Sequence, residues 1–106
     1  MKKKFIVRKN EEIKKIVKSS KKIVNKYFIV YFAENNFSYN RYCVSVSKKI
    51  GKAHTRNLFK RRVKDILMKN NINNSKDYVI ILRNIIVNIS YEKMQYELLD
   101  ILKGDK

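Results

Sequence analysis

The segment at residues 45–67, SVSKKIGKAHTRNLFKRRVKDIL, constrains the fold more than any other part of the chain. It contains eight Lys and Arg, with no acidic residue between Lys48 and Lys64. Gly51 suits a sharp turn and Thr55 can cap a helix, so the pattern predicts a strand end, a loop and a helix from Thr55 to about residue 69. Such dense positive charge is costly unless a polyanion neutralises it or solvent screens it.

The predicted helix separates apolar from cationic side chains. At about 100° per residue, Phe59, Val63, Ile66 and Leu67 share one side and are expected in the core. Another side presents a row of hydrogen-bond donors, and the loop lysines before the helix extend the same surface. The helix N-terminus adds free N–H groups and a partial positive charge. The candidate phosphate-binding residues are Lys48, Lys49, Lys52, Arg56, Asn57, Lys60, Arg61, Arg62 and Lys64.

The distribution of charge along the chain supports a binding surface. The net charge is +17, and residues 1–64 contain twenty basic and three acidic residues, whereas residues 65–106 contain six of each. A general bias toward lysine codons would raise the charge of both halves. The asymmetry therefore favours a surface for nucleic acid or another polyanion. The alternative is a solvated helix face, but solubility alone usually mixes signs and places Glu four residues before Lys, a pair that this segment lacks.

The remaining pattern predicts the order α-β-β-α-β-α. Asn10 is expected to cap a first helix that buries Ile13, Ile16 and Val17, and Ser90 to cap a last helix. Strands are expected at residues 26–34, 41–47 and 78–83, the first two forming a hairpin around a turn at 35–40, with a polar loop at 70–77. With 106 residues and no linker, we expect one domain over residues 1–106, an α/β (α+β) two-layer sandwich.

Several classes of site lack the residues they need. Cys43 is the only cysteine and is expected to fill space on a strand, and His54 is the only histidine. The nine carboxylates are scattered, so neither a catalytic relay nor a metal cluster is predicted in the protein. No apolar run approaches the roughly 18 residues of a membrane span, and no signal peptide is recognisable. We expect a cytoplasmic protein with no membrane contact and no evident obligate protein partner.

The stretch SVSKKIGKAHTRNLFKRRVKD resembles the signature of the protein subunit of bacterial ribonuclease P, approximately S-V-S-K-K-x-G-x-A-V-x-R-N-R-I-K-R-L-x-R. The similarity extends over nearly the whole chain, through RKNEEIKKIVKSS, NKYFIVYF, DYVIILR and SYEKMQYELLDIL. It implies a small α/β sandwich with a left-handed crossover through the signature helix, an exception to the usual handedness. It also implies partners: a catalytic RNA that performs the hydrolysis with Mg²⁺, and precursor tRNA, whose 5′ leader is removed.

The resemblance further implies a cleft for the single-stranded leader between the first helix and the sheet. The matching residues are Ile13, Val17, Tyr27, Ile29 and Tyr31. The two helix positions are typically Phe in the family and are aliphatic here. Because bases stack on aromatic rings, we expect a weaker grip on the leader unless Tyr27 or Tyr31 compensates. An equally simple interpretation is that Ile13 and Val17 only pack the core.

The signature departs from the family pattern at two positions. Its second Arg is replaced by Leu58, and a family Leu is replaced by Arg62. We hypothesise that Arg62 restores the missing cation about 6 Å away, one helical turn along the same side.

Two other functions fit the composition. One is a structural RNA-binding protein of the ribosomal type, which the linked S-V-S-K-K and R-N-x-x-K-R pattern disfavours. The other is a DNA-binding helix, but base-reading side chains and a dimer surface are not recognisable.

Overall fold

The computed structural model describes residues 2–19, 21–70, 72 and 74–104. Three α-helices and four strands make up most of this part of the chain, joined by three short 3₁₀ helices. In chain order they are η1 Lys3–Phe5, α1 Asn10–Lys18, β1 Lys22–Val24, β2 Phe28–Glu34, β3 Arg41–Val46, η2 Lys48–Ile50, α2 Ala53–Asn70, β4 Lys76–Leu82, η3 Asn84–Asn88 and α3 Tyr91–Gly104. Of the loop predicted at 70–77, residues 71 and 73 lie outside the described residues.

The four strands form one sheet in the order β1-β2-β4-β3. β2 pairs antiparallel with both β1 and β4, whereas β3 pairs parallel with β4. The predicted hairpin between β2 and β3 is therefore wrong, because β4 lies between them. The physical reason is burial: β4 carries apolar residues on both faces and is almost wholly buried, which suits a central strand, while β3 carries exposed Ser45 and suits an edge.

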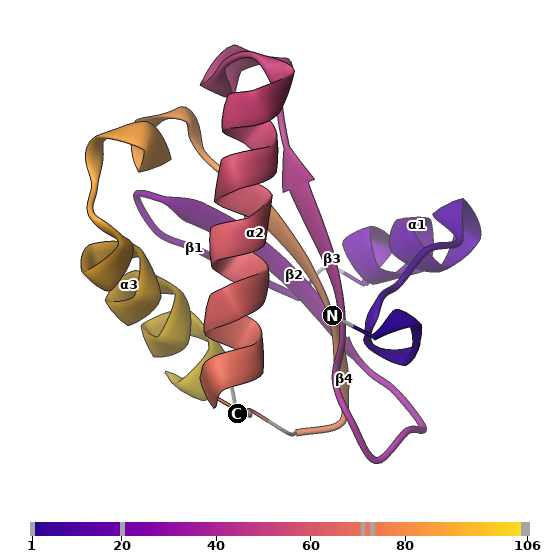
Figure 1. Cartoon of the computed structure of the whole chain (residues 1–106). Coiled ribbons are helices and arrows are strands. Elements are labelled where there is room, and N and C mark those ends of the chain that lie inside the picture. The colour runs from indigo at the N-terminus through magenta and orange to yellow at the C-terminus, as the bar shows by residue number, and fades with distance from the viewer. Residues whose placement is uncertain (1, 20, 71, 73, 105–106) are drawn as a thin grey trace.

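The connection from β3 through α2 to β4 is a left-handed crossover. Figure 1 shows α2 in front of the sheet, with β3 to the right of β4 and both strands running upward. This confirms the α/β sandwich and the crossover that the resemblance implied. α2 and α3 cover one face of the sheet, and α1 lies on the other (Figure 1).

The larger core lies between the sheet and the helices α2 and α3. Its fully buried members include Phe28, Tyr78, Ile80, Met94 and Leu98. A smaller cluster on the opposite face joins α1 to the sheet through the buried side chains of Val7, Ile16 and Val79. Because the nine-residue helix α1 is short, it covers only part of its face and leaves the rest open.

The local signals for helix starts had mixed outcomes. Ser90 caps α3 as predicted, since its Oγ accepts a hydrogen bond of 3.1 Å from the N–H of Lys93. Asn10 does not cap α1: it is the first helical residue, and the preceding Lys9 makes no side-chain cap. Thr55 lies inside α2, because the carbonyl of Lys52 already accepts from the N–H of Arg56.

Gly51 is required where the chain turns from β3 into α2. Its φ of 153° is rarely adopted by residues with a side chain, and a Cβ there would lie 3.2 Å from Cγ2 of Thr55. The glycine thus allows η2 to pack against the start of α2, with Ile50 buried beneath the turn.

Strand β1 was missed in the sequence because it has only three residues. It is joined to β2 by a turn that Asn25 organises, its Oδ1 accepting from the N–H groups of Tyr27 and Phe28 at 2.9 and 2.7 Å. The strand predicted to begin at residue 26 therefore begins at Phe28.

Candidate nucleic-acid interface

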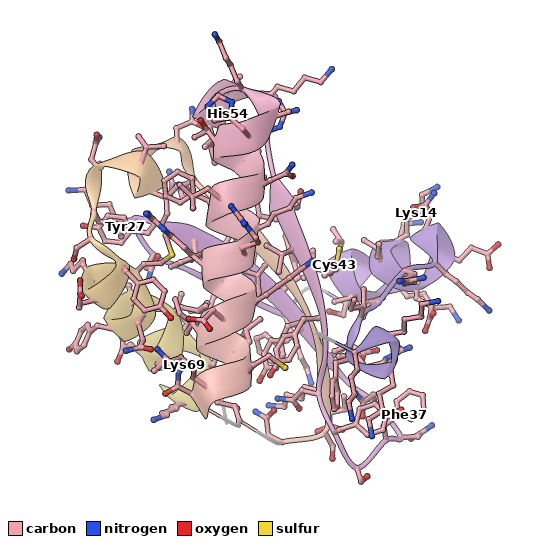
Figure 2. The ribbon with its side chains drawn as sticks, in the orientation of Figure 1. Lys14, Tyr27, Phe37, Cys43, His54 and Lys69 are labelled. Atoms are coloured by element: carbon pink, nitrogen blue, oxygen red, sulfur yellow. The ribbon has the colours of Figure 1, made fainter. Side chains whose placement is uncertain are left out.

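Helix α2 is buried on one side and cationic on another. Phe59, Val63, Ile66 and Leu67 are all buried, which confirms the predicted core side of the helix. Four of the predicted donor residues lie on one outer face of the helix and, with His54, line a shallow depression: His54, Asn57, Lys60, Arg61 and Lys64. Figure 2 shows His54 at the first turn of the helix. Burying one side thus fixes the direction in which the other side presents its cations.

The cations of this depression are available to a ligand. Within the described ranges, no carboxylate lies within ion-pairing distance of Lys60, Arg61 or Lys64. Lys60 and Lys64 are half-buried, and Arg61 is exposed. Long stems that pack on apolar surface while the charged ends reach water are typical of such residues. The result is a concentrated positive field on one face of α2.

Two predicted site residues have structural contacts of their own. The Arg56 guanidinium donates from Nη1 to the Gly51 carbonyl at 3.2 Å, so it braces the turn before α2. The Arg62 guanidinium lies 5.3 Å from the centre of the Phe59 ring. By the helical wheel, Arg62 is on the flank of α2 opposite Lys60 and Lys64. Neither contact uses all the donors of an arginine.

The three lysines before α2 occupy its N-terminal end. Lys48 and Lys49 belong to η2, Lys52 follows Gly51, and all three are exposed. Lys48 and Lys52 extend the positive surface at the end of α2. Lys49 also lines a second depression, on the sheet face that α1 leaves open, together with Lys26, Ile29, Ser47, Ile81, Leu82, Arg83, Asn84 and Ile85.

Four of the five predicted leader-cleft residues lie on the α1 side of the sheet. Ile13 and Tyr31 pack against the small cluster beneath α1, and Val17 is 37% exposed. Ile29 pairs with Ile81, and both line the second depression. Beside α1, this side of the sheet therefore presents an open apolar surface with cations at its edge.

Tyr27 does not belong to this face. It packs against the larger core on the opposite side of the sheet, and Figure 2 shows it near α3. The alternation of side chains that placed it beside Ile29 holds only within a strand. Tyr27 precedes β2 and lies in the turn organised by Asn25, so the rule does not extend to it.

An ion network missed in the sequence fixes α1 to the sheet. Arg41 donates to both oxygens of Asp77, at 2.9 and 2.6 Å, and to Glu12 of α1 at 2.7 Å. Asn35 donates to Asp77 as well, at 2.8 Å. The hydrogen bond to Asp77 is the main reason that the pKa of Arg41 is raised above its usual value. Arg41 and Asp77 are 36 positions apart, so no spacing rule predicts their contact from the sequence. Strand alternation predicts only that Arg41 lies on the α1 side of the sheet with Cys43.

The structure also shows how possible metal ligands and the Cys43 thiol are arranged. In the part of the chain that the structure describes, no three His, Cys, Asp or Glu side chains are grouped so as to hold a metal ion. Cys43 packs against the cluster beneath α1, as expected, and burial raises the pKa of its thiol, which disfavours the reactive thiolate. The described helices include none that is long and apolar enough to cross a bilayer.

Proteins with similar sequences and structures are known for this chain. The model of the family Ribonuclease P matches residues 1–104. The ribonuclease P protein component of Mycoplasma mycoides is 38% identical over 110 residues, covering 100% of both chains. A Staphylococcus aureus RNase P protein mutant with defective mRNA degradation activity superposes with a TM-score of 0.89 and 29% identity, covering 95% of this chain and 87% of that one. For the RNase P protein of Thermotoga maritima the values are 0.87 and 31%, with coverage of 94% and 96%.

The fold and the cationic helix define a class of small basic α/β proteins with a left-handed β-α-β crossover. Within that class, the chain belongs to the ribonuclease P protein family. It is an accessory protein subunit of an endoribonuclease.

Proposed function

We propose that the protein binds the catalytic RNA of ribonuclease P through α2 and the 5′ leader of precursor tRNA across the α1 face of the sheet. In this role it assists the Mg²⁺-dependent removal of the leader in tRNA maturation. The observation that carries the proposal is the row of cations Lys60, Arg61 and Lys64 on a helix whose core side is buried; among the described residues, none of the three has a carboxylate within ion-pairing distance.

Phosphate binding follows from how these donors are held. Lys60 and Lys64 are one helical turn apart, with Arg61 beside them, so neighbouring phosphates of one strand can be contacted together. Lys48 and Lys52 add charge at the helix N-terminus, where the backbone also favours anions. The Gly51 carbonyl holds Arg56 by one nitrogen, which orients the rest of its donors. Binding of this kind releases counterions and weakens steeply with salt.

The opposite face of the sheet suits a single strand. Tyr31 offers a half-buried aromatic ring, and Val17 and Ile29 offer apolar contact beside it. Beyond them the open depression carries Lys26, Lys49 and Arg83, whose charges can follow a phosphate backbone. Stacking combined with backbone contacts accepts any sequence, as binding of varied leaders requires. Since Tyr27 lies on the other side, Tyr31 is the residue left to compensate for the aliphatic Ile13 and Val17.

The chemistry is assigned to the RNA. Several carboxylates of the protein are already engaged, Asp77 and Glu12 with Arg41 and Glu97 with Lys93. We therefore place the Mg²⁺ ions mainly on the RNA, where they would supply the nucleophile and stabilise charge on the scissile phosphate. The protein contributes binding energy and alignment.

The test is precursor-tRNA cleavage by the catalytic RNA at low Mg²⁺, with and without the purified protein. We expect the protein to stimulate cleavage, because its cations reduce the need for screening metal ions. Binding to the RNA without stimulation would favour the structural, ribosomal type of protein instead. If the protein neither binds the RNA nor stimulates cleavage, the proposal is overturned.

A further inference from the structure

A pocket of about 290 Å³ lies at the end of the molecule away from the Gly51 turn. Three segments distant in sequence enclose it: η1, the 35–40 loop between β2 and β3, and the last turns of α2. Its lining includes the aromatic residues Phe5 and Tyr39, with Lys4 and Met68. The volume is at the lower end of the range for small-molecule sites, so it suits a single ring system.

The aromatic wall of this pocket is fixed in place. The rings of Phe5 and Tyr39 meet edge to face, with centroids 5.4 Å apart. Phe37 stacks on Tyr39 at 5.2 Å, and the Arg41 guanidinium lies 4.8 Å from the centre of the Phe37 ring. Because Asp77 holds Arg41 by two hydrogen bonds, the stack rests on a rigid base. Figure 2 shows Phe37 at the tip of this loop.

A cation stands beside the same rings. Nζ of Lys4 lies 5.0 Å from the centre of the Phe5 ring and 5.1 Å from that of Tyr39. An aromatic surface with an adjacent positive charge is the combination that binds an unpaired nucleotide, the base by stacking and the phosphate by attraction. A neutral apolar ligand would gain nothing from Lys4.

The polar floor of the pocket is already satisfied within the protein. Asn40 is 3% exposed, and its Nδ2 donates to the hydroxyl of Tyr42 and the carbonyl of Ile72. Its Oδ1 accepts from the backbone N–H groups of Asn74 and Lys76. Asn40 therefore has no free group with which to read the edge of a base, and stacking on the aromatic wall, which accepts different bases, becomes the main contact.

The pocket is continuous with the cationic face of α2. Arg61 and Lys64 line both the depression of that face and a neighbouring one, which also contains Met68. Met68, 42% exposed, in turn lines the pocket. A strand whose phosphates are held by Arg61 and Lys64 is thereby led to the aromatic wall within one to two helical turns.

We propose that this pocket receives an unpaired nucleotide of the partner RNA, stacked on Tyr39 and Phe5, with Lys4 at its phosphate. The inference rests on the proposed function, because it requires RNA bound along α2. It adds a second kind of contact near the C-terminal end of α2. The stacking of the base on an aromatic ring is insensitive to salt, whereas the contact of Lys4 with the phosphate depends on salt like those of the helix.

The experiment measures affinity for the catalytic RNA as a function of salt. Tyr39→Leu should weaken binding about tenfold with little change in salt slope, the loss expected for one stacked base, while Tyr39→Phe should bind like wild type. Lys4→Gln should lower the salt slope by about one, and the matched control Lys3→Gln, with the same charge loss in the same 3₁₀ helix, by less. Phe5→Leu serves as a second aromatic variant should Tyr39→Leu fail to fold by circular dichroism.

Ultraviolet cross-linking of the wild-type complex, followed by peptide mass mapping, gives a direct readout. A nucleotide adduct on Phe5 or Tyr39 supports the proposal. Wild-type affinity of the folded aromatic variants, with adducts confined to α2, would overturn it and leave the proposed function intact. Failure of the wild-type protein to bind the RNA would instead remove the proposed function, and this inference with it. If the pocket binds a peptide rather than RNA, the aromatic variants should likewise bind the RNA with wild-type affinity, and the proposal would be overturned.

Discussion

Exchanging Leu58 and Arg62 tests whether the position of one cation on α2 can shift by a helical turn. Leu58 is 37% exposed, so arginine fits there without burying charge. Leucine at position 62 can pack on Phe59, where the Arg62 guanidinium now lies 5.3 Å from the ring. Losing that contact costs about 0.5–1 kcal/mol before leucine offsets part of it. The Tm should therefore fall by no more than about 5 °C, and every variant should fold.

Because all variants should fold, differences in their affinity for the catalytic RNA should reflect only the change of charge at positions 58 and 62. If Arg62 contacts one phosphate, as hypothesised, Arg62→Leu should lower the salt slope by about 0.7–0.9. Between 50 and 200 mM salt, the ratio of wild-type to variant affinity should accordingly change about threefold. Leu58→Arg combined with Arg62→Leu should restore both affinity and slope, since the cation moves by about 6 Å. Arg62→Lys, which keeps the charge, is the control. Equal binding by wild type, single and double variants would refute the idea that Arg62 replaces the missing arginine.

Three further predictions concern other parts of the molecule. Arg41→Met should lower the stability by about 3 kcal/mol, because it leaves the buried Asp77 carboxylate without its charged partner and with only the amide of Asn35 among its side-chain donors, and thermal unfolding would show it; an unchanged Tm would contradict this role. Tyr31→Leu should weaken binding of precursors with long leaders and spare those with a one-nucleotide leader; an equal effect on both would exclude a leader contact. The hydrogen bond to Asp65 raises the pKa of Tyr91 to about 12. This bond therefore stabilises the fold below the usual tyrosine pKa near 10 and is lost as the pH rises toward 12. In a tyrosine absorbance titration Asp65→Asn should titrate one phenol earlier than wild type, while Tyr42, whose pKa is raised by burial, should titrate late in both proteins. No difference between the two proteins would disprove this role of Asp65.

The parts of the fold that local patterns control were predictable from the sequence. The apolar side of α2 follows from the spacing of Phe59, Val63, Ile66 and Leu67, and all four are buried. The serine cap of α3 is likewise a matter of adjacent residues. The left-handed crossover was available only through the family resemblance, because general handedness rules favour the opposite hand.

Features that depend on residues far apart in the chain could not be predicted from the sequence. Strand pairing depends on which strand buries both faces, so β4 displaced β3 from the hairpin that a short connection suggested. The contacts of Arg41 with Asp77 and Glu12 join three separate elements, and no spacing rule reports them. Tyr27 was misplaced because alternation was extended one residue beyond the start of β2. The pocket beside Tyr39 exists only after η1, a loop and the end of α2 come together.

The central claim is that the cations on one face of α2 contact RNA phosphates. It is tested most directly by the salt dependence of binding to the catalytic RNA for a variant with Lys60→Gln and Lys64→Gln. Two lost contacts should lower the slope by about 1.4–1.8. The matched control, Lys14→Gln with Lys18→Gln, removes the same charge at the same spacing from exposed positions on α1 and should leave the slope near that of wild type. Equal slopes for both double variants would contradict the account.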